Sequence, residues 1–328
     1  MGNNLNGEVA VVTGSGQGIG RAIAIEMAKE GAKVVTNNRK PNSTDVTNLV
    51  GYSMDSLNKT RQDKLNKGIA ELKGDAESVA NEIKKLGGQA IPFYGDVADF
   101  KTAGKLIQTA VDSFGSIDIL VNNAGTFRYA NIWNMTEEIW DAVTLNKPKS
   151  YFNTIRHAVP YMMKQKWGRI INTSSPAWLG SAMENSNYCA ANAGVVGLTR
   201  GVARELYSYG ITCNAFAPSA LTRATVTILA RWEKEDENGI PTDKGRTAAF
   251  ERAPVAEALA PFITFLATQD AANITGTVFR VGGNHVGLYS DPQEIATIDK
   301  KEGMWTVDEL RQVAPRDLLK IYKNFAQK

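Results

Sequence analysis

Cysteine and histidine are scarce in this chain of 328 residues, which contains two of each. Cys189 and Cys213 cannot form a disulfide framework, so we expect a protein of a reducing compartment and therefore a cytoplasmic location. The two histidines, His157 and His285, lie far apart in the chain. Without clustered cysteine or histidine a zinc site has no support, and we predict no metal.

A long apolar run and a strong charge of one sign are also missing. No segment approaches the roughly 20 apolar residues that span a bilayer, and the first residues lack the basic-then-apolar order of a signal peptide. The formal net charge is +3, from 37 basic and 34 acidic residues scattered along the chain. So small a charge does not predict nucleic-acid binding. We therefore expect a soluble protein with neither a membrane nor a nucleic acid as partner.

Short apolar runs alternate with helical patterns through most of the chain. "EVAVVTG" predicts a buried strand, "GIGRAIAIEMAKEGA" a helix that ends at Gly31, and "KVVTNN" a second strand. The alternation continues through a long helical stretch at 137–165 to "TGTVFRVGG", the last expected strand. Strands that alternate with helices predict a parallel sheet covered on both faces. We therefore expect a doubly wound α/β (Rossmann) fold, as a single domain over residues 1–283.

Two polar segments interrupt this pattern. We interpret residues 41–74 as a surface insertion and residues 223–255 as a lid insertion. Residues 284–328 form a C-terminal extension that we expect to pack on the core or on a partner subunit. Thr306 and Glu309 have the spacing of a capping box, which predicts a short helix there.

The segment "TGSGQGIG" follows the first predicted strand and opens the first predicted helix. Glycines at positions 14, 18 and 20 allow a tight turn and a close approach to a pyrophosphate at the positive end of the helix. Glycine-rich turns also occur for packing alone, but the strand-turn-helix context favours a nucleotide site.

Further motifs follow in a fixed order. They are "GDV" at 95–97, "NNAG" at 122–125, and Ser175 thirteen residues before Tyr188. Together with the TGxxxGxG spacing they resemble the short-chain dehydrogenase/reductase family over about residues 5–283. The second half and the tail are similar, more loosely, to the 3-hydroxyacyl-CoA dehydrogenase domain of multifunctional β-oxidation enzymes. The resemblance implies an NAD(P)-dependent oxidoreductase that interconverts a secondary alcohol and a ketone on a small molecule, as a dimer or tetramer. The looser similarity implies a 3-hydroxyacyl-CoA-like substrate.

The same resemblance implies a set of cofactor-binding residues. Asp96 and Val97 would hold the adenine, and the "NNAG" segment would pack beside the cofactor. The full set is Gly14, Ser15, Gln17, Gly18, Ile19, Gly20, Asn38, Arg39, Asp96, Val97, Asn123, Ala124, Gly125, Tyr188, Pro218 and Thr222.

The choice between NAD and NADP depends on the end of the second strand. A carboxylate there would bind the ribose hydroxyls and exclude a 2′-phosphate. This chain has Asn38 followed by Arg39; an amide does not repel phosphate, and a guanidinium can bind it. We therefore favour NADP over NAD. The alternative is that Arg39 only caps a solvated loop.

By resemblance the catalytic set is Asn146, Ser175, Tyr188 and the residue at position 192. Serine would hold the substrate oxygen and tyrosine would exchange a proton with it, assisted by a lysine at the fourth position. This chain has Asn192 there. A free tyrosine has a pKa of about 10, and losing a close cation forfeits about one to three pKa units, or roughly ten- to a thousandfold in proton transfer. We expect impaired chemistry or, as the alternative, a catalytically silent nucleotide-binding subunit that pairs with an active homologue.

Other cations offer little compensation on sequence grounds. Arg200 and Arg204 follow position 192 on the same predicted helix, at distances of about 12 and 18 Å. Lys147, next to Asn146, and Arg223 are less constrained, and Lys147 is the better candidate to supply the missing cation. The alternative, which we favour, is that Lys147 is a solvated helix residue. Trp178 and Met183, between Ser175 and Tyr188, are predicted to line an apolar substrate pocket.

Overall fold

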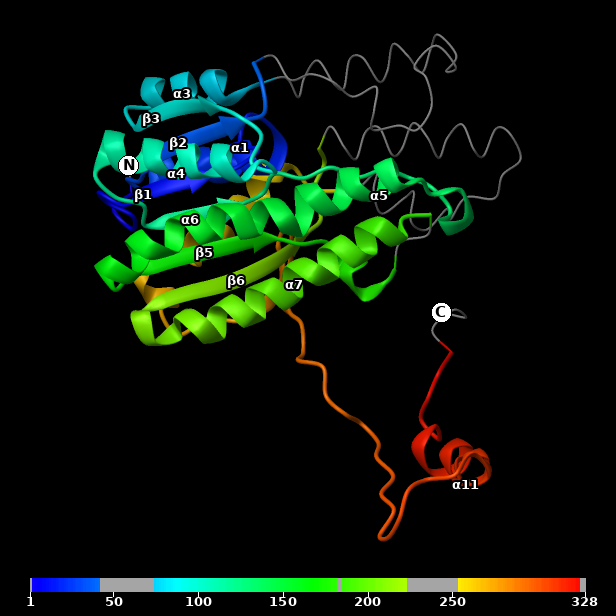
Figure 1. The fold of residues 1–328 in the computed structure, drawn as a ribbon. Helices are drawn as coiled ribbons and strands as arrows, with labels where there is room; N and C mark the ends of the chain where they lie inside the picture. Colours follow the sequence, from blue (N-terminus) through cyan, green and yellow to red (C-terminus); the bar gives the residue numbers. More distant parts are fainter. Residues whose placement is uncertain (1, 42–73, 182–183, 223–252, 325–328) are drawn as a thin grey trace. The chain divides into compact units, whose positions relative to one another are not determined.

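The structure of the chain is a computed structural model that describes residues 2–41, 74–181, 184–222 and 253–324 (Figure 1). It comprises two compact units, Met1–Leu288 and Tyr289–Lys328. Most of the two insertions expected from the sequence, at 42–73 and 223–252, lies outside the described residues. The first unit carries the motifs identified above.

One sheet of eight strands forms the centre of the first unit, in the order β3-β2-β1-β4-β5-β6-β7-β8. All neighbouring strands are parallel except β8, which runs antiparallel to β7. This topology confirms the predicted doubly wound fold, and the strand order reverses between β1 and β4. The strands are β1 (Val9–Val12), β2 (Lys33–Asn38), β3 (Gln89–Tyr94), β4 (Ile119–Asn122), β5 (Gly168–Thr173), β6 (Ile211–Pro218), β7 (Val278–Gly282) and β8 (His285–Leu288).

Helices cover both faces of this sheet. The core on one face is made with α1, α3 and α10, and the core on the other face with α4, α6 and α7 (Figure 1). The helices are α1 (Gly18–Lys29), α3 (Ala76–Lys85), α4 (Phe100–Phe114), α5 (Glu137–Thr144), α6 (Ser150–Gln165), α7 (Ser186–Leu206) and α10 (Ala260–Phe265). Shorter turns are η2 (Ile132–Asn134), η3 (Leu145–Lys149), η4 (Pro176–Leu179), η5 (Tyr207–Tyr209), η6 (Ala256–Leu259) and η7 (Gln269–Ala271).

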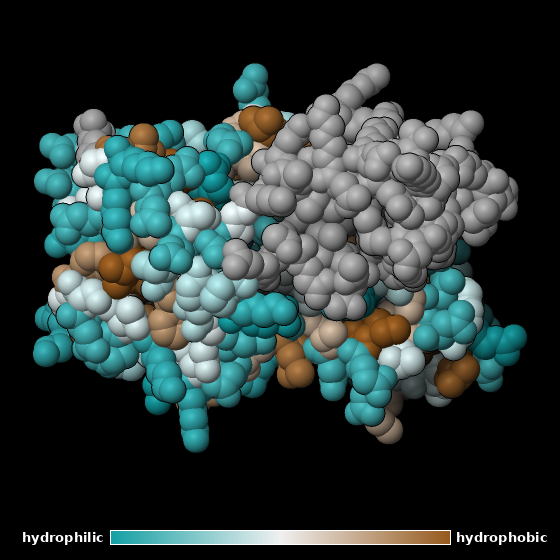
Figure 2. Space-filling model, turned by 90° about the horizontal axis from the view of Figure 1, so that it is seen from above, coloured by the Kyte–Doolittle hydropathy of each residue, from teal (hydrophilic) through white to brown (hydrophobic). Residues whose placement is uncertain are grey.

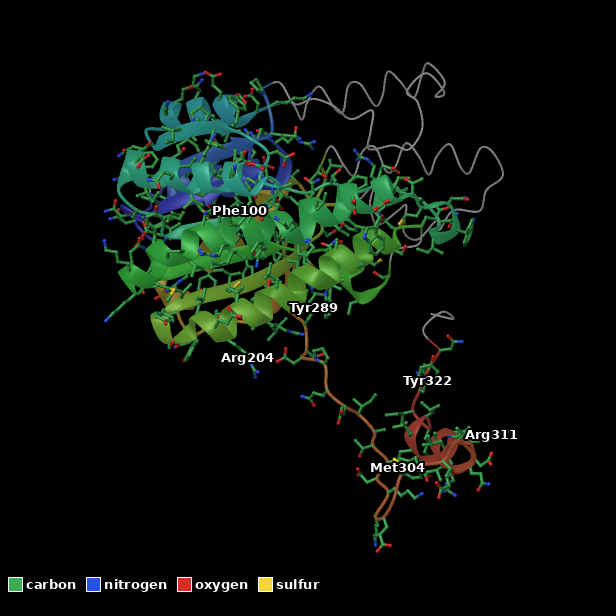
Figure 3. All side chains as sticks on the ribbon, in the orientation of Figure 1. Phe100, Arg204, Tyr289, Met304, Arg311 and Tyr322 are labelled. Atoms are coloured by element: carbon green, nitrogen blue, oxygen red, sulfur yellow. The ribbon has the colours of Figure 1, made fainter. Side chains whose placement is uncertain are left out.

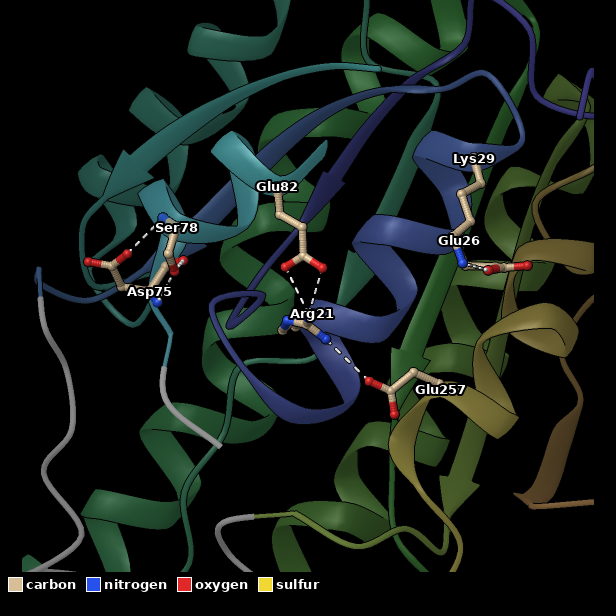
Figure 4. A network of polar contacts seen from close by, with 7 residues as sticks. All are labelled: Arg21, Glu26, Lys29, Asp75, Ser78, Glu82 and Glu257. Carbon is tan, nitrogen blue, oxygen red and sulfur yellow. Dashed lines mark hydrogen bonds and ion pairs between the residues drawn. The ribbon is translucent and has the colours of Figure 1, made fainter. Parts of the chain in front are cut away.

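Ion pairs hold the helices of the first face together near their exposed ends. Arg21 of α1 binds Glu82 of α3 at 2.7 Å and Glu257 of η6 at 3.2 Å (Figure 4). The visible surface in Figure 2 is mainly hydrophilic, with apolar residues in small separate patches. No helix in the described ranges combines the length and the apolar character needed to cross a bilayer.

The long helical stretch expected at 137–165 is broken in the structure. Between α5 and α6, Lys147 has φ −154° and ψ 134°, which is extended backbone. The next residue is Pro148, which has no N–H to donate and disfavours the helical conformation of the residue before it. The break therefore turns Lys147 out of the helical path.

Strand β8 was not predicted from the sequence. It pairs with β7 from Gly282 opposite His285, through a turn in which Gly283 has φ +56°. The first unit consequently extends to Leu288, five residues past the boundary expected at 283.

The second unit contains α11 (Val307–Val313) and the turn η8 (Ala314–Leu318). The Thr306 side chain accepts the N–H of Glu309, whose carboxylate accepts the N–H of Thr306 at 2.8 Å. This capping box confirms the predicted helix start. Figure 3 labels Met304, Arg311 and Tyr322 of this unit.

A buried polar network ties the two central strands to the helices. Asn122 of β4 donates to Asn172 of β5 at 2.9 Å and accepts the hydroxyl of Thr154, on α6, at 2.6 Å. Asn172 in turn donates to Thr199, on α7, at 3.0 Å. All four side chains are fully buried. The network fixes α6 and α7 at the carboxyl end of the sheet.

We expect Asn122→Ala to lower the free energy of unfolding by about 2–4 kcal/mol, because it removes the donor to the buried Asn172 Oδ1 and one acceptor of the Thr154 hydroxyl. Urea unfolding measures this loss. The matched control is Asn134→Ala, which removes an exposed amide and should change the stability by less than about 0.5 kcal/mol. Equal effects of the two substitutions would contradict the role of the network.

Candidate functional site

The loop between β1 and α1 is a close-packed glycine turn. Gly14 and Gly18 have φ of +61° and +55°, in the left-handed region that favours glycine. A Cβ on Gly20 would lie 2.5 Å from Asn123 Nδ2. Helix α1 begins after Gln17 without a side-chain cap and has no acidic residue in its first turn. Its first N–H groups are therefore suited to an anion such as a pyrophosphate.

Side chains from neighbouring strands hold this loop in place. Thr13 Oγ1 accepts the N–H groups of Asn123 and Ala124 at 2.9 and 3.0 Å, and Asn123 Nδ2 donates back to Thr13 O at 3.2 Å. Ser15 Oγ accepts the N–H of Asn37 at 2.8 Å. The predicted residues Ser15 and Asn123 thus shape the loop. Thr13 and Asn37 are further loop residues that sequence reasoning missed, since no spacing marks such contacts.

The end of β2 offers a polar pocket for the adenosine part of a dinucleotide. Asn38 is 8% exposed, and its Oδ1 is buried without a hydrogen-bond partner in the described part of the chain. A Cβ on Gly16 would collide with this oxygen, so the glycine leaves the space open. The side chain of Arg39 is exposed, and its Nε lies 3.7 Å from Asp96 Oδ2. A buried acceptor without a partner is suited to a ribose hydroxyl, so these residues fit the dinucleotide.

The remaining predicted binding residues lie around the same edge. Pro218 ends β6, and Thr222 lies beside the glycine loop, 3.5 Å from where a Cβ on Gly18 would be. Trp178 is half-buried in η4, the turn that begins directly after Ser175. Met183 lies outside the described residues. Within the described ranges, no three His, Cys, Asp or Glu side chains come together as a metal site would require.

Ser175 and Tyr188 meet at the carboxyl end of β5. Ser175 follows the strand and caps η4, where its Oγ accepts the N–H of Ala177 at 3.2 Å. Tyr188 lies in the first turns of α7. Burial raises the pKa of the Tyr188 hydroxyl above its usual value, while hydrogen bonds with the side chains of Ser175 and Asn192 act in the opposite direction. A serine hydroxyl and a phenol so placed can bind one substrate oxygen and exchange a proton with it.

Asn192 is fully buried one turn along α7. Its Nδ2 donates to the carbonyl oxygen of Tyr188 at 2.8 Å, which occupies one of its two donor hydrogens in the helix itself. Its Oδ1 accepts from Lys147 Nζ at 3.4 Å. The amide therefore links Tyr188 to a lysine that comes from outside α7.

Lys147 is buried, with 4% of its surface exposed. Its Nζ donates to Thr173 O at 2.8 Å and lies 5.9 Å from the ring centroid of Tyr188 and 5.8 Å from that of Tyr151. Burial lowers the pKa of Lys147 to about 7. Among the described residues no carboxylate forms an ion pair with it. The expectation of a solvated Lys147 is wrong, because the break before Pro148 directs the residue into the core.

The other sequence expectations for this cluster have mixed outcomes. Asn146 donates from Nδ2 to Ala142 O at 2.8 Å, so its amide is bonded within the preceding helical turn. Arg204 is exposed on α7, at the far end of that helix from Tyr188 (Figure 3). The premise that no cation lies near Tyr188 is contradicted by Lys147.

The fold is typical of α/β proteins that bind a nucleotide, and the site brings a serine and a tyrosine together at the carboxyl end of β5. The profile described as "short chain dehydrogenase" matches residues 8–52 and 61–234. The chain therefore belongs to the short-chain dehydrogenase/reductase family, as the resemblance of its motifs predicted.

Two relatives and one solved structure extend the comparison. The chain is 36% identical over 281 residues to a peroxisomal hydratase-dehydrogenase-epimerase of Neurospora crassa, covering 86% of this chain but only 27% of that protein. It is 34% identical over 285 residues to a 3-oxoacyl-(acyl-carrier-protein) reductase of Staphylococcus aureus, covering 85% of this chain and 97% of that protein. A crystal structure of a short chain dehydrogenase from Mycobacterium avium matches with a TM-score of 0.73 at 33% identity, over 96% of this chain and 95% of that one.

The buried lysine makes the stability depend on pH. The pKa of Lys147 is about 7 in the folded protein against 10.5 ordinarily, so between these values the unfolded chain binds more protons. The cost of burying Lys147 is therefore fully present below about pH 7 and is relieved as the pH rises towards 10. Relative to Lys147→Met, the parent should gain stability over this range, by up to about 1.4 kcal/mol per pH unit.

Urea unfolding of both proteins at several pH values measures this difference. Lys149→Met is the control, because Lys149 is only partly buried and bonds Asn153 in the first turn of α6. Parallel pH profiles for the parent and Lys147→Met would show that Lys147 titrates like a solvated lysine.

Proposed function

We propose that this chain is an NAD(P)-dependent oxidoreductase that interconverts a secondary alcohol and a ketone. The observation that carries the proposal is the pairing of Ser175 with Tyr188 in a fold whose α1 N-terminus has no side-chain cap. When bound, the dinucleotide supplies or accepts the hydride. In reduction Ser175 binds the substrate oxygen and Tyr188 gives it a proton; in oxidation Tyr188 takes the proton back.

The proposed substrate is a 3-oxoacyl or 3-hydroxyacyl thioester. Support comes from the names of the relatives: one is a 3-oxoacyl-(acyl-carrier-protein) reductase, and another includes a dehydrogenase between hydratase and epimerase. The 3-oxo and 3-hydroxy forms differ by the reaction assigned to Ser175 and Tyr188. The half-buried Trp178, three residues after Ser175, supports an apolar wall beside the reacting carbon.

The proposed cofactor preference is NADP. Asn38 carries no charge that would repel a 2′-phosphate, and the exposed Arg39 beside it can turn to bind one. The cytoplasmic location stays a prediction, since one relative is named as a peroxisomal protein.

The proposed assembly is a homo-oligomer that pairs through α5, α6 and α7. Exposed apolar side chains on two of these helices support it, among them Trp140 on α5 and Phe152 on α6. The alternative of a silent subunit that needs an active homologue is less well supported, since Lys147 provides a cation at the tyrosine.

The activity is tested with the purified chain alone, NADPH or NADH, and a 3-oxoacyl thioester. We expect turnover, and a fall of roughly a thousandfold in Tyr188→Phe, because that variant lacks the proton donor. Tyr209→Phe, which alters an exposed tyrosine, is the matched control and should keep the parent rate. A homo-oligomer by light scattering that turns over would exclude the silent subunit, whereas no turnover with intact dinucleotide binding would favour it.

The cofactor preference is tested with Arg39→Ala. The substitution removes a charge-assisted contact to phosphate, so the Kd of NADPH should rise about ten- to a hundredfold while that of NADH stays unchanged. Fluorescence titration measures both constants, and Arg204→Ala, on the exposed side of α7, is the control. Equal Kd changes for the two dinucleotides would contradict the assignment of Arg39.

A further inference from the structure

A positive charge reaches Tyr188 from outside α7. Position 192, one turn after the tyrosine, holds a neutral amide. The ammonium of Lys147 fills the space beside it, 3.4 Å from Asn192 Oδ1 and 5.9 Å from the Tyr188 ring centroid. The two linked residues are 45 positions apart in the chain.

The surrounding backbone makes room for this lysine. The extended conformation before Pro148 turns Lys147 inward. A Cβ on Gly125, in the loop after β4, would lie 2.7 Å from Lys147 Cε. A Cβ on Gly194, on α7, would lie 3.1 Å from Pro148 Cγ. Gly125 therefore leaves space for the Lys147 side chain, and Gly194 leaves space for the ring of Pro148.

Burial of the Lys147 ammonium lowers the stability of the folded protein. The contacts of Lys147 are a carbonyl oxygen, an amide oxygen and two phenol rings, none of which carries a formal negative charge in its ordinary state. A buried cation without a carboxylate partner destabilises a protein relative to an apolar residue of similar shape. Such groups are concentrated at functional sites, where the charge serves the chemistry.

Resting on the oxidoreductase function proposed above, we propose that Lys147 is the positioning residue that controls the protonation of Tyr188, in place of an ammonium at position 192. The ammonium comes from a different element. The family resemblance implies an ammonium on α7, whereas this chain has Asn192 there and Lys147 at the α5–α6 junction, next to Asn146.

The charge acts on the phenol as the proton moves. In reduction the O–H bond of Tyr188 breaks, its proton passes to the substrate oxygen, and the carbonyl carbon receives the hydride. The phenolate left behind is stabilised by the ammonium of Lys147 until solvent returns the proton. At about 6 Å, in the effective dielectric of a protein, this attraction corresponds to roughly ten- to a hundredfold in rate. In oxidation the same attraction favours the phenolate that accepts the proton.

Lys147 is the group in the cluster that titrates near neutral pH. The titratable side chains around it are Tyr151 on α6 and Tyr188 and Cys189 on α7. Burial raises the pKa of both tyrosines and lowers that of Lys147 to about 7. The rate of reduction should therefore fall as the pH rises through about 7, because the ammonium loses its proton.

The kinetic test compares the parent with Lys147→Met, Lys147→Met/Asn192→Lys and the control Lys149→Met. We expect Lys147→Met to reduce the thioester about ten- to a hundredfold more slowly at neutral pH and to lose the fall in rate near pH 7. The double variant returns an ammonium from α7 and should recover at least about tenfold. NADPH binding by fluorescence should be unchanged in Lys147→Met.

A second readout needs neither substrate nor dinucleotide. The NMR signal of the Lys147 ε-carbon, absent from Lys147→Met, should titrate near pH 7, whereas solvated lysines titrate near 10. If Lys147→Met does not fold, Lys147→Gln replaces it, and the parent should still show one lysine signal that titrates near neutral pH.

The outcomes separate this proposal from the proposed function. A parent that neither binds a dinucleotide nor turns over contradicts the function itself. A parent that turns over, with Lys147→Met equal to it in rate and pH profile, overturns the role of Lys147 and leaves the function standing. A Lys147 signal that titrates near 10 also overturns it.

Discussion

The burial of one ammonium group connects the features of this protein that matter for its chemistry. Lys147 bonds the last carbonyl of β5 and the amide of Asn192, and its charge lies beside the ring of Tyr188. Among the described residues the ion is held by dipoles and not by a carboxylate, which leaves its charge uncompensated at the phenol. An ammonium paired with a carboxylate would destabilise the fold less when buried. It would also stabilise the phenolate of Tyr188 less strongly as the proton leaves.

The sheet topology brings the parts of the site to one edge. The strand order reverses between β1 and β4, and the glycine loop and the "NNAG" segment follow these two strands. Contacts between Thr13 and Asn123 join the two segments directly. β5 carries Ser175 at its end, and the buried amide network anchors α7, which carries Tyr188. A crevice at such a switch point is where open α/β sheets bind their ligands.

Membership of a family does not require that each charge come from the same position in the chain. Electrostatic stabilisation depends on the distance and the medium between two groups, whatever backbone atom carries them. A lysine on the α5–α6 junction and one on α7 can therefore serve the same tyrosine, provided that the backbone directs the side chain inward. In this chain the extended backbone before Pro148 directs Lys147 inward, and Gly125 leaves space for its side chain.

Local patterns in the sequence were sufficient for the parallel sheet, the glycine turn and the start of α11, and they named Ser175 and Tyr188, whose side chains come together in the structure. Each depends on residues close in the chain or on motifs in a fixed order. The break at Lys147, strand β8 and the loop contacts of Thr13 were decided by tertiary structure. From the sequence alone, Lys147 beside Pro148 is expected to be a solvated helix residue. In the structure it is buried by Gly125, Asn192 and Thr173. These neighbours are distant in the chain, so a local pattern cannot predict the burial.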